Sequence, residues 1–281
     1  MPCIVGFCKG TVIKLTNFLR LEFEMKITVG YWAIRGLAAP LRMMLMYKAV
    51  PFQCTLYECR ENADGSFNRD VWLQDAKPAL RERNALMNLP YIIDEEDVVV
   101  AQSNACFLYL GRKLDMLGDN SKELSLCEQL LFEVMDLRNQ LVGYAYSPRG
   151  ASQEETAKWL IGIRGILDKL NAVLSAAPNS ALPFFVGARA SAPDFHIWEI
   201  LDQINSIASF HSQSNPVADF PALQSFHTTF ASLPENKRYI SSPLHSLPMN
   251  NPSAKVGATP ACGPWVSGST VFAWEGRSGM Y

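Results

Sequence analysis

Tyr31 is the first residue of the chain whose type and position could do chemistry. Ile27, Val29 and Tyr31 alternate on one face of a predicted short strand, which favours burial of the tyrosine ring. Arg35 and Gly36 then interrupt the strand pattern. A tyrosine at the last position of a strand can pack its ring and still present its hydroxyl at the sheet edge as a hydrogen-bond donor. The alternative is an ordinary core ring with a satisfied hydroxyl.

Gln102 and Ser103 mark a second place where polar groups gather. The sequence pattern changes there from strand to helix. The first backbone N–H groups of a helix and the positive end of its dipole bind carboxylates, and the Ser103 hydroxyl adds a donor. The pair could instead serve only as a helix N-cap, and the two roles are compatible.

The elements that must position these residues are predicted in the order β-α-β, then α-β-β-α. Right-handed crossovers arrange them as one mixed four-stranded sheet with helices on its faces. An irregular polar loop is predicted over 58–70. The strands are predicted over 26–31, 52–57, 91–94 and 98–101, and the helices over 37–49, around 71–77 and from 103 to about 117.

A second, all-helical domain is predicted over 121–248. Leucine, isoleucine and valine recur there at helical spacing, and no strand pattern competes. Ser191 and Asp194 are spaced as a capping box at the start of one helix. The predicted fold class is therefore α/β plus all-α, with the α/β domain over 25–117.

Both ends of the chain fall outside these domains. Residues 1–24 lack a convincing signal or transit peptide, and Met25 directly precedes the first strand. This stretch is predicted to be either a disordered extension or the product of an in-frame start upstream of Met25. Residues 249–281 are rich in glycine, serine, proline and asparagine without periodicity, which predicts a largely unstructured tail.

The composition excludes several classes of function. The 281 residues are 48% hydrophobic and 19% charged, which is typical of a soluble globular protein with two domains. A net charge of −2 with no basic run argues against nucleic-acid binding, and no apolar run is long enough for a membrane span. Seven scattered cysteines without a C-x-x-C pair indicate reduced thiols in the cytoplasm, and four histidines without ligand spacing predict no metal site.

Three motifs, in their order and spacing, carry a resemblance to a known family. They read GYWAIRGLA from Gly30, NLPYIID from Asn88 and AQSNA from Ala101. The chain resembles the cytosolic glutathione transferases, and looks most like their mu class, from about Met25 to Pro248. This resemblance implies a thioredoxin-like N-terminal domain, a cytoplasmic homodimer, glutathione as co-substrate with no permanently bound cofactor, and conjugation of glutathione to hydrophobic electrophiles.

By this resemblance Tyr31 is the catalytic residue, whose hydroxyl hydrogen-bonds the glutathione sulfur. A free thiol with a pKa of about 8.5 is only about 7% thiolate near a pH of about 7.4. One charge-assisted hydrogen bond of about 1.5 to 3 kcal/mol would lower that pKa by about one to two units. The thiolate is the nucleophile, so this single bond matters.

The resemblance also implies how the rest of glutathione is held. Leu89, which precedes a cis Pro90, pairs its backbone with the cysteinyl part, and Gln102 and Ser103 bind the γ-glutamyl carboxylate. Asp136 reaches across the dimer to the γ-glutamyl amine, the alternative being a solvated helical aspartate. The expected glutathione-binding residues are Tyr31, Trp32, Leu37, Arg69, Trp72, Lys77, Asn88, Leu89, Pro90, Gln102, Ser103 and Asp136.

One part of the expected glutathione site departs from the family pattern. Arg69, Trp72 and Lys77 match the residues that hold the glycyl carboxylate, but the family lysine lies one residue nearer the tryptophan. Lys113 and Arg81 are weaker candidates for the same role.

The acceptor substrate is expected on the helical domain side. Apolar residues at helical spacing are more often only core, but the family tyrosine at Tyr146 can donate to the negative charge that develops on the electrophile. Leu86 stands where the class places the aromatic key of its dimer contact, which predicts a looser or differently locked dimer. The expected electrophile-binding residues are Ile34, Leu37, Met135, Val142 and Tyr146.

Two other functions stay open. A non-catalytic relative could keep the fold, although intact Tyr31, Asn88, Gln102, Ser103 and Asp136 count against it. A glutathione-dependent isomerase is compatible with the same residues. A thiol transferase that uses a cysteine is disfavoured, because a tyrosine ends the first strand.

Overall fold

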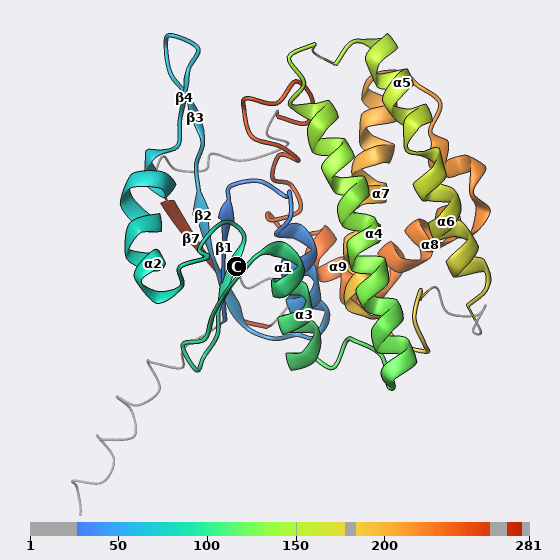
Figure 1. Ribbon diagram of the computed structural model, residues 1–281, viewed down its shortest axis with the longest axis horizontal. Helices are drawn as coiled ribbons and strands as arrows, with labels where there is room; N and C mark the ends of the chain where they lie inside the picture. The colour runs from blue at the N-terminus through green and yellow to red at the C-terminus, as the bar shows by residue number, and fades with distance from the viewer. Residues whose placement is uncertain (1–26, 150, 178–183, 259–268, 277–281) are drawn as a thin grey trace, which may run out of the picture.

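The computed structural model describes residues 27–149, 151–177, 184–258 and 269–276 (Figure 1). An α/β domain packs beside a helical domain, in agreement with the predicted fold class. The predicted N-terminal extension, residues 1–24, lies outside the described residues. Among the helices described, none combines the length and the apolar character that crossing a membrane requires.

A five-stranded mixed sheet forms the centre of the N-terminal domain. Its strands are β1 Ile27–Trp32, β2 Phe52–Tyr57, β5 Tyr91–Ile93, β6 Val99–Ala101 and β7 Ser269–Trp274. The strand order is β6-β5-β1-β2-β7. β1 and β2 are parallel, and the other neighbouring pairs are antiparallel. The four strands expected from alternation are therefore present, and a fifth joins them.

The fifth strand, β7, corrects two predictions. The sheet has five strands rather than four, and the 249–281 tail is structured in its described parts. β7 pairs along all of β2, with Trp274 opposite Phe52. Trp274 is only 1% exposed, and its ring centroid lies 6.0 Å from that of Phe52. The unpaired backbone of an edge strand and a buried tryptophan together stabilise a strand in an otherwise polar tail.

The connections of the N-terminal domain also differ from the predictions in detail. The loop over 58–70 is not irregular, because β3 (Arg60–Glu61) and β4 (Phe67–Asn68) form a short hairpin. The helix expected near 71–77 is a π-helical turn, η1 (Val71–Ala76), followed by α2 (Lys77–Arg83). The helix that connects β1 to β2 is α1 (Ala39–Tyr47).

The helix α3 (Ser103–Lys113) ends before the predicted position near residue 117. Asp115 has a φ of 55°, in the left-handed region. A residue in this conformation just past a helix terminates it, because the following N–H groups turn back to the last carbonyls. Met116 accordingly donates its N–H to the Gly111 carbonyl at 2.7 Å.

The C-terminal domain is helical, as predicted. Its central helices, α4 and α7, pack against each other (Figure 1). The predicted capping box before α7 is confirmed, because the N–H and the hydroxyl of Ser191 both donate to Asp194 at 2.7 Å. The helices are α4 Ser121–Ala145, α5 Gln153–Gly162, α6 Arg164–Ser175, α7 Ala192–Phe210, the 3-10 turn η2 Pro216–Asp219, α8 Pro221–Ser232 and α9 Pro234–Ile240.

Candidate active site

The pairing register places several of the predicted site residues at one end of the sheet. Tyr91 of β5 lies opposite both Gly30 of β1 and Ala101 of β6. Neighbouring strands are about 4.8 Å apart, so the ends of these three strands lie within about 10 Å of one another. The residues one step beyond that row, at the same end of the sheet, are Tyr31, Pro90 and Gln102.

The ring of Tyr31 is buried, as its alternation with Ile27 and Val29 predicted. The residue is 6% exposed, and Gly36 turns against its ring with a φ of 42°. A Cβ added to Gly36 would lie 2.6 Å from Cε1 of Tyr31 and 2.9 Å from its hydroxyl oxygen. The glycine thus covers the ring rather than leaving it open, at a distance that a side chain would prevent. No hydrogen bond of the hydroxyl is found among the described residues, and its oxygen is not one of the fully buried polar atoms, so the hydroxyl keeps access to solvent.

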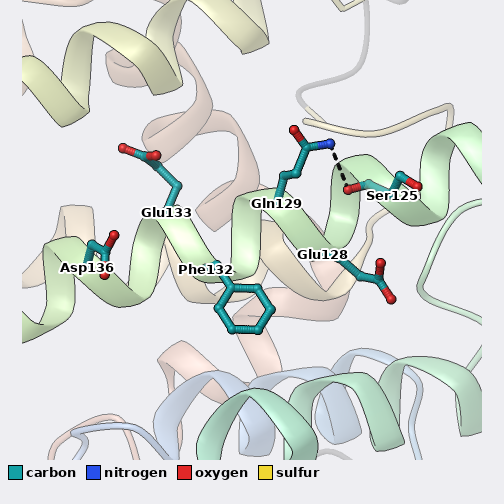
Figure 2. Close-up of a pocket in the computed structure, with 6 residues that line it drawn as sticks. All are labelled: Ser125, Glu128, Gln129, Phe132, Glu133 and Asp136. Carbon is teal, nitrogen blue, oxygen red and sulfur yellow. Dashed lines mark hydrogen bonds between the residues drawn. The ribbon is translucent and has the colours of Figure 1, made fainter.

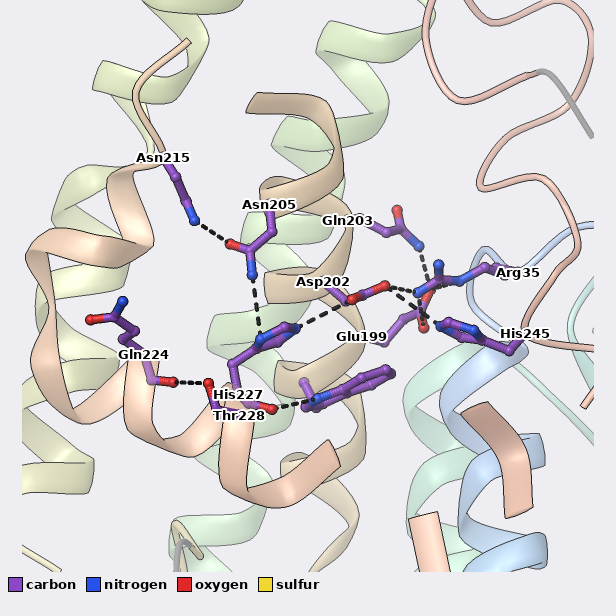
Figure 3. A network of polar contacts seen from close by, with 11 residues as sticks. Arg35, Glu199, Asp202, Gln203, Asn205, Asn215, Gln224, His227, Thr228 and His245 are labelled. Atoms are coloured by element: carbon purple, nitrogen blue, oxygen red, sulfur yellow. Dashed lines mark hydrogen bonds and ion pairs between the residues drawn. The ribbon is translucent and has the colours of Figure 1, made fainter. Parts of the chain in front are cut away.

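A buried ion-pair network holds the turn that follows Tyr31 (Figure 3). Arg35 donates from Nε and Nη2 to the Glu199 carboxylate of α7 at 3.0 and 2.9 Å, and Nη2 also pairs with Asp202 at 2.5 Å. Burial disfavours the charged guanidinium, but the two carboxylates outweigh it and raise the pKa of Arg35. Removing one partner of such a buried pair costs about 3 to 5 kcal/mol, so this turn is firmly fixed.

Asp202 extends the network to two histidines (Figure 3). Its carboxylate oxygens lie 3.3 Å from Nε2 of His227 and 3.7 Å from Nε2 of His245. Burial alone would raise the pKa of Asp202, but the two histidines and Arg35 lower it. The indole of Trp198 stacks on the His227 ring with a centroid distance of 5.6 Å. The network therefore ties α7, α8 and the residues after α9 to the turn beside Tyr31.

The remaining residues of this turn lie at the junction of the two domains. Arg42 of α1 is fully buried, and its Nη1 donates to the Ile34 carbonyl at 2.9 Å. Ile34 is 4% exposed, whereas Leu37 and Trp32 are half-buried and pack against the core. The structure therefore brings Ile34, Leu37 and Trp32 together with Tyr31.

The described residues after α9 fold over the same turn. The Pro248 and Met249 carbonyls accept the N–H groups of Arg35 and Gly36 at 2.8 and 3.3 Å. Lys255 donates its N–H to the carbonyl at the end of α4 at 2.7 Å. Figure 1 shows this segment as the red-orange loop between the sheet and α4. The predicted domain end at residue 248 is therefore too early, and local composition gave no sign of these distant contacts.

Tyr146, just after α4, faces this segment. Its hydroxyl accepts the backbone N–H of Asn251 at 2.9 Å. Burial raises the pKa of Tyr146 in spite of that hydrogen bond. Tyr146 and the turn after Tyr31 are therefore held by the same segment, through Asn251 and Pro248 respectively.

Trp72 and Lys77 are joined by the π-helical turn. The N–H of Lys77 donates to the Trp72 carbonyl, five residues earlier, and Nζ of Lys77 lies 5.9 Å from the Trp72 ring centroid. Trp72 itself is 1% exposed and stacks with Tyr91. A π-turn spans one more residue than an α-turn, so it absorbs the extra residue between tryptophan and lysine. Arg69, whose carbonyl accepts the Trp72 N–H at 3.0 Å, is exposed nearby.

The backbone at the sheet end has two special conformations. The Leu89–Pro90 peptide bond is cis, which confirms the prediction, and Asn88 beside it is exposed. Gln102 has a φ of 74°, and its side chain does not cap α3. The first N–H groups of α3, from Ser103 onward, are therefore not occupied by this side chain and can donate hydrogen bonds to an anion.

Asp136 lies on an exposed face of α4 (Figure 2). With Phe132, which is 58% exposed, it lines a groove of about 530 Å³. The lining residues are Ser125, Glu128, Gln129, Phe132, Glu133 and Asp136. The structure therefore places Asp136 in this outer groove and Tyr31 at the domain junction. Within the described residues, no group of histidines, cysteines and acids could hold a metal ion.

Met135, Val142 and Tyr146 are half-buried along one stripe of α4 and its C-terminal cap. Arg138 lies on the same stripe, three residues after Met135 and four before Val142, and it is 4% exposed. Sequence reasoning missed Arg138, although its spacing from Met135 and Val142 was a usable signal.

Family comparisons match both domains. Residues 27–112 match the model of the glutathione S-transferase N-terminal domain, and residues 135–243 match the model of the C-terminal domain. The chain is 32% identical to Glutathione S-transferase Mu 3 of Macaca fuscata fuscata over 245 residues, which is 86% of this chain and 100% of that protein. It is 30% identical to Glutathione S-transferase Mu 1 of Oryctolagus cuniculus over 218 residues, or 78% of this chain and 92% of that protein.

Solved structures share the fold. The crystal structure of the glutathione S-transferase Blo t 8 superposes with a TM-score of 0.66 at 26% identity, covering 82% of this chain and 99% of that one. The pi-class enzyme of Onchocerca volvulus superposes with a TM-score of 0.64 at 23% identity, covering 82% and 100%. The thioredoxin-like sheet, the helical second domain and the sequence matches agree, and the chain therefore belongs to the glutathione S-transferase family, with mu-class relatives.

Proposed function

We propose that this protein conjugates glutathione to hydrophobic electrophiles in detoxification, with Tyr31 as the residue that activates the thiol. The observation that carries the proposal is the Tyr31 hydroxyl. It stands at the sheet end beside the cis Pro90 and the start of α3, enclosed by Gly36 and without a hydrogen-bond partner among the described residues. The ring is buried, but the hydroxyl oxygen is not among the fully buried polar atoms without a partner, so it is open to a ligand, and a glutathione sulfur would accept its hydrogen bond.

The reaction is a nucleophilic substitution by sulfur. Tyr31 donates a hydrogen bond to the glutathione sulfur, which lowers the thiol pKa, and the thiol proton passes to solvent. The thiolate then attacks the electrophilic carbon; a C–S bond forms, the bond to the leaving group breaks, and the leaving group departs with that electron pair. The Tyr146 hydroxyl, which accepts from Asn251, keeps its own proton to donate to negative charge that develops on the electrophile.

Glutathione would lie across the end of the sheet. The Leu89 backbone would pair with its cysteinyl part, and the open N-terminus of α3, at Gln102 and Ser103, would bind the γ-glutamyl carboxylate. Asn88, Leu37 and the Trp32 indole would complete this side of the site.

The glycyl carboxylate would bind between Arg69 and Lys77. The π-turn supports Lys77 over the alternatives Lys113 and Arg81, since it returns Lys77 to the Trp72 ring despite the extra residue. Lys113 is already paired with Asp94 and Glu95 at 3.2 and 2.8 Å.

A homodimer would complete the site. Asp136 lies in the outer groove of α4, and a partner chain seated there could bring its own glutathione to this carboxylate. Leu86 is 69% exposed, as a residue that inserts into a partner would be. The described cysteines, Cys54, Cys59, Cys106 and Cys127, are free thiols, which fits the expected cytoplasmic location.

The test compares the full-length wild type with Tyr31→Phe. We expect both proteins to bind immobilised glutathione, and the variant to conjugate 1-chloro-2,4-dinitrobenzene at least about tenfold more slowly, because it loses a thiol pKa shift of about one to two units. Equal rates would remove Tyr31 from its assigned role. Glutathione binding without conjugation by the wild type would instead favour a non-catalytic relative.

A further inference from the structure

Arg138 is a buried charged residue that the mechanism above does not use. It is 4% exposed, and its Nε and Nη1 are buried with no hydrogen-bond partner among the described residues. Arg35 provides a contrast, since it is 5% exposed but binds the carboxylates of Glu199 and Asp202. Arginine cannot release its proton, so a guanidinium with two buried, unpaired nitrogens is a costly feature that needs an explanation.

The position of Arg138 on α4 points to the electrophile site. Met135, Val142 and Tyr146, which the family resemblance predicts to line that site, lie three residues before it and four and eight residues after it. At 3.6 residues per turn these four positions share one stripe of the helix. Arg138 is therefore the one charged residue among these four positions of the stripe, which ends at Tyr146.

Tyr146 and His196, two groups whose pKa Arg138 affects, are neutral near pH 7. The charge of Arg138 lowers the pKa of the Tyr146 hydroxyl against the stronger effect of burial. Burial and Arg138 lower the pKa of His196 to about 3, so its imidazole brings no countercharge. Asp136, two residues before Arg138, is exposed and lines the outer groove of α4. An anion at this site would meet two donors, the guanidinium and the Tyr146 hydroxyl.

We propose that Arg138 binds a carboxylate carried by the electrophile, and that the preferred acceptor substrates are hydrophobic electrophiles with an acidic group. This inference rests on the proposed conjugation function. A guanidinium forms charge-assisted hydrogen bonds with carboxylates, which are among the strongest polar contacts in proteins. The apolar residues of the stripe would pack against the hydrophobic part of the same substrate.

The test uses two substrates that differ in charge. The full-length wild type, Arg138→Met and Arg138→Lys are assayed with 4-chloro-3-nitrobenzoate and with its neutral methyl ester. Their intrinsic reactivities differ, so each variant is compared with the wild type on the same substrate. We expect Arg138→Met to lower kcat/KM for the acid by roughly tenfold or more and for the ester by less than about threefold, while Arg138→Lys retains part of the preference.

A binding measurement separates this inference from the proposed function. Calorimetry measures the affinity of unreactive 3-nitrobenzoate and of its methyl ester in the presence of S-methylglutathione. We expect Arg138→Met to weaken binding of the acid alone, by roughly tenfold, even if the wild type conjugates neither chloro compound. Equal losses for acid and ester, or no loss for either, would overturn the role of Arg138. Thermal unfolding of each variant shows whether it is folded, and Arg138→Lys carries the test if Arg138→Met is not.

Discussion

Gly36 lies directly against the ring of Tyr31, and a Cβ at this position would come within 2.9 Å of the tyrosine hydroxyl oxygen. The same glycine donates its backbone N–H to the Met249 carbonyl at 3.3 Å. One residue without a side chain therefore encloses the proposed catalytic ring on one side and docks the segment after α9 on the other. The position of the Tyr31 hydroxyl depends on this contact.

We expect Gly36→Ala to move Tyr31 and to weaken the fold. The φ of 42° is unfavourable for alanine, and the added Cβ would displace the ring. Stability to urea should fall by roughly 1 to 3 kcal/mol, and conjugation should slow at least about tenfold. Gly143→Ala is the matched control, since no atom lies within 4 Å of its added Cβ in the exposed face of α4. Full activity in Gly36→Ala would show that the close contact is not needed.

Lys77→Ala should weaken glutathione binding without slowing the chemical step. The residue is half-exposed beside Trp72, so the loss of its charge should raise KM for glutathione by roughly fivefold and leave kcat within about twofold. Steady-state kinetics at varied glutathione gives both values. Arg81→Ala, an exposed cation of the same helix, should leave KM nearly unchanged. The reverse result would assign the glycyl carboxylate to Arg81.

Trp274→Ala should destabilise the N-terminal domain, although the residue lies far from the domain in the sequence. The indole is 1% exposed against Phe52, and its removal from a packed site costs about 3 to 5 kcal/mol. Loss of β7 would also uncover the edge of β2, so we expect increased light scattering on storage. Val271→Ala in the same strand is the control, because Val271 is 63% exposed. Similar unfolding midpoints for both variants would contradict a packed β7.

His196→Phe should make the protein less sensitive to acid. Burial and the charge of Arg138 lower the pKa of His196 to about 3, below its ordinary value of about 6.5. The unfolded chain therefore binds a proton that the folded chain does not, and stability falls as the pH drops below about 6.5. At a pH of about 5 this effect costs the wild type about 2 kcal/mol, which the variant should recover.

The measurement for His196→Phe is urea unfolding at pH 8 and pH 5. Both ring nitrogens of His196 are buried without a partner among the described residues, and the ring stacks on Phe107 at 4.8 Å. Phenylalanine should therefore fit at pH 8 with little change. Burial raises the pKa of Asp194 to about 7, which gives an opposite slope in both proteins and cancels in their difference. If the loss of unfolding free energy between pH 8 and pH 5 is the same in the wild type and in His196→Phe, His196 is not the acid-sensitive group.

The sequence by itself determined the elements that depend on short spacing. Alternation placed β1 and β2, the helical period placed α4, and the spacing of Ser191 and Asp194 placed the start of α7. These signals are local because strand and helix periods, caps and turns are set by residues a few positions apart. The alternation of β1 also predicted the buried ring of Tyr31, whereas the roles of Tyr31 and Tyr146 came from the family resemblance.

Only the tertiary structure decided what covers those elements. The pairing of β7 with β2, the hydrogen bonds from Asn251 to Tyr146 and from Gly36 to Met249, and the burial of Arg138 all join segments distant in the sequence. The energy of such contacts comes from partners that no local pattern reveals. The polar composition of the tail therefore predicted disorder. In the structure, β7 instead pairs with the backbone of the edge strand β2 and buries Trp274 against Phe52.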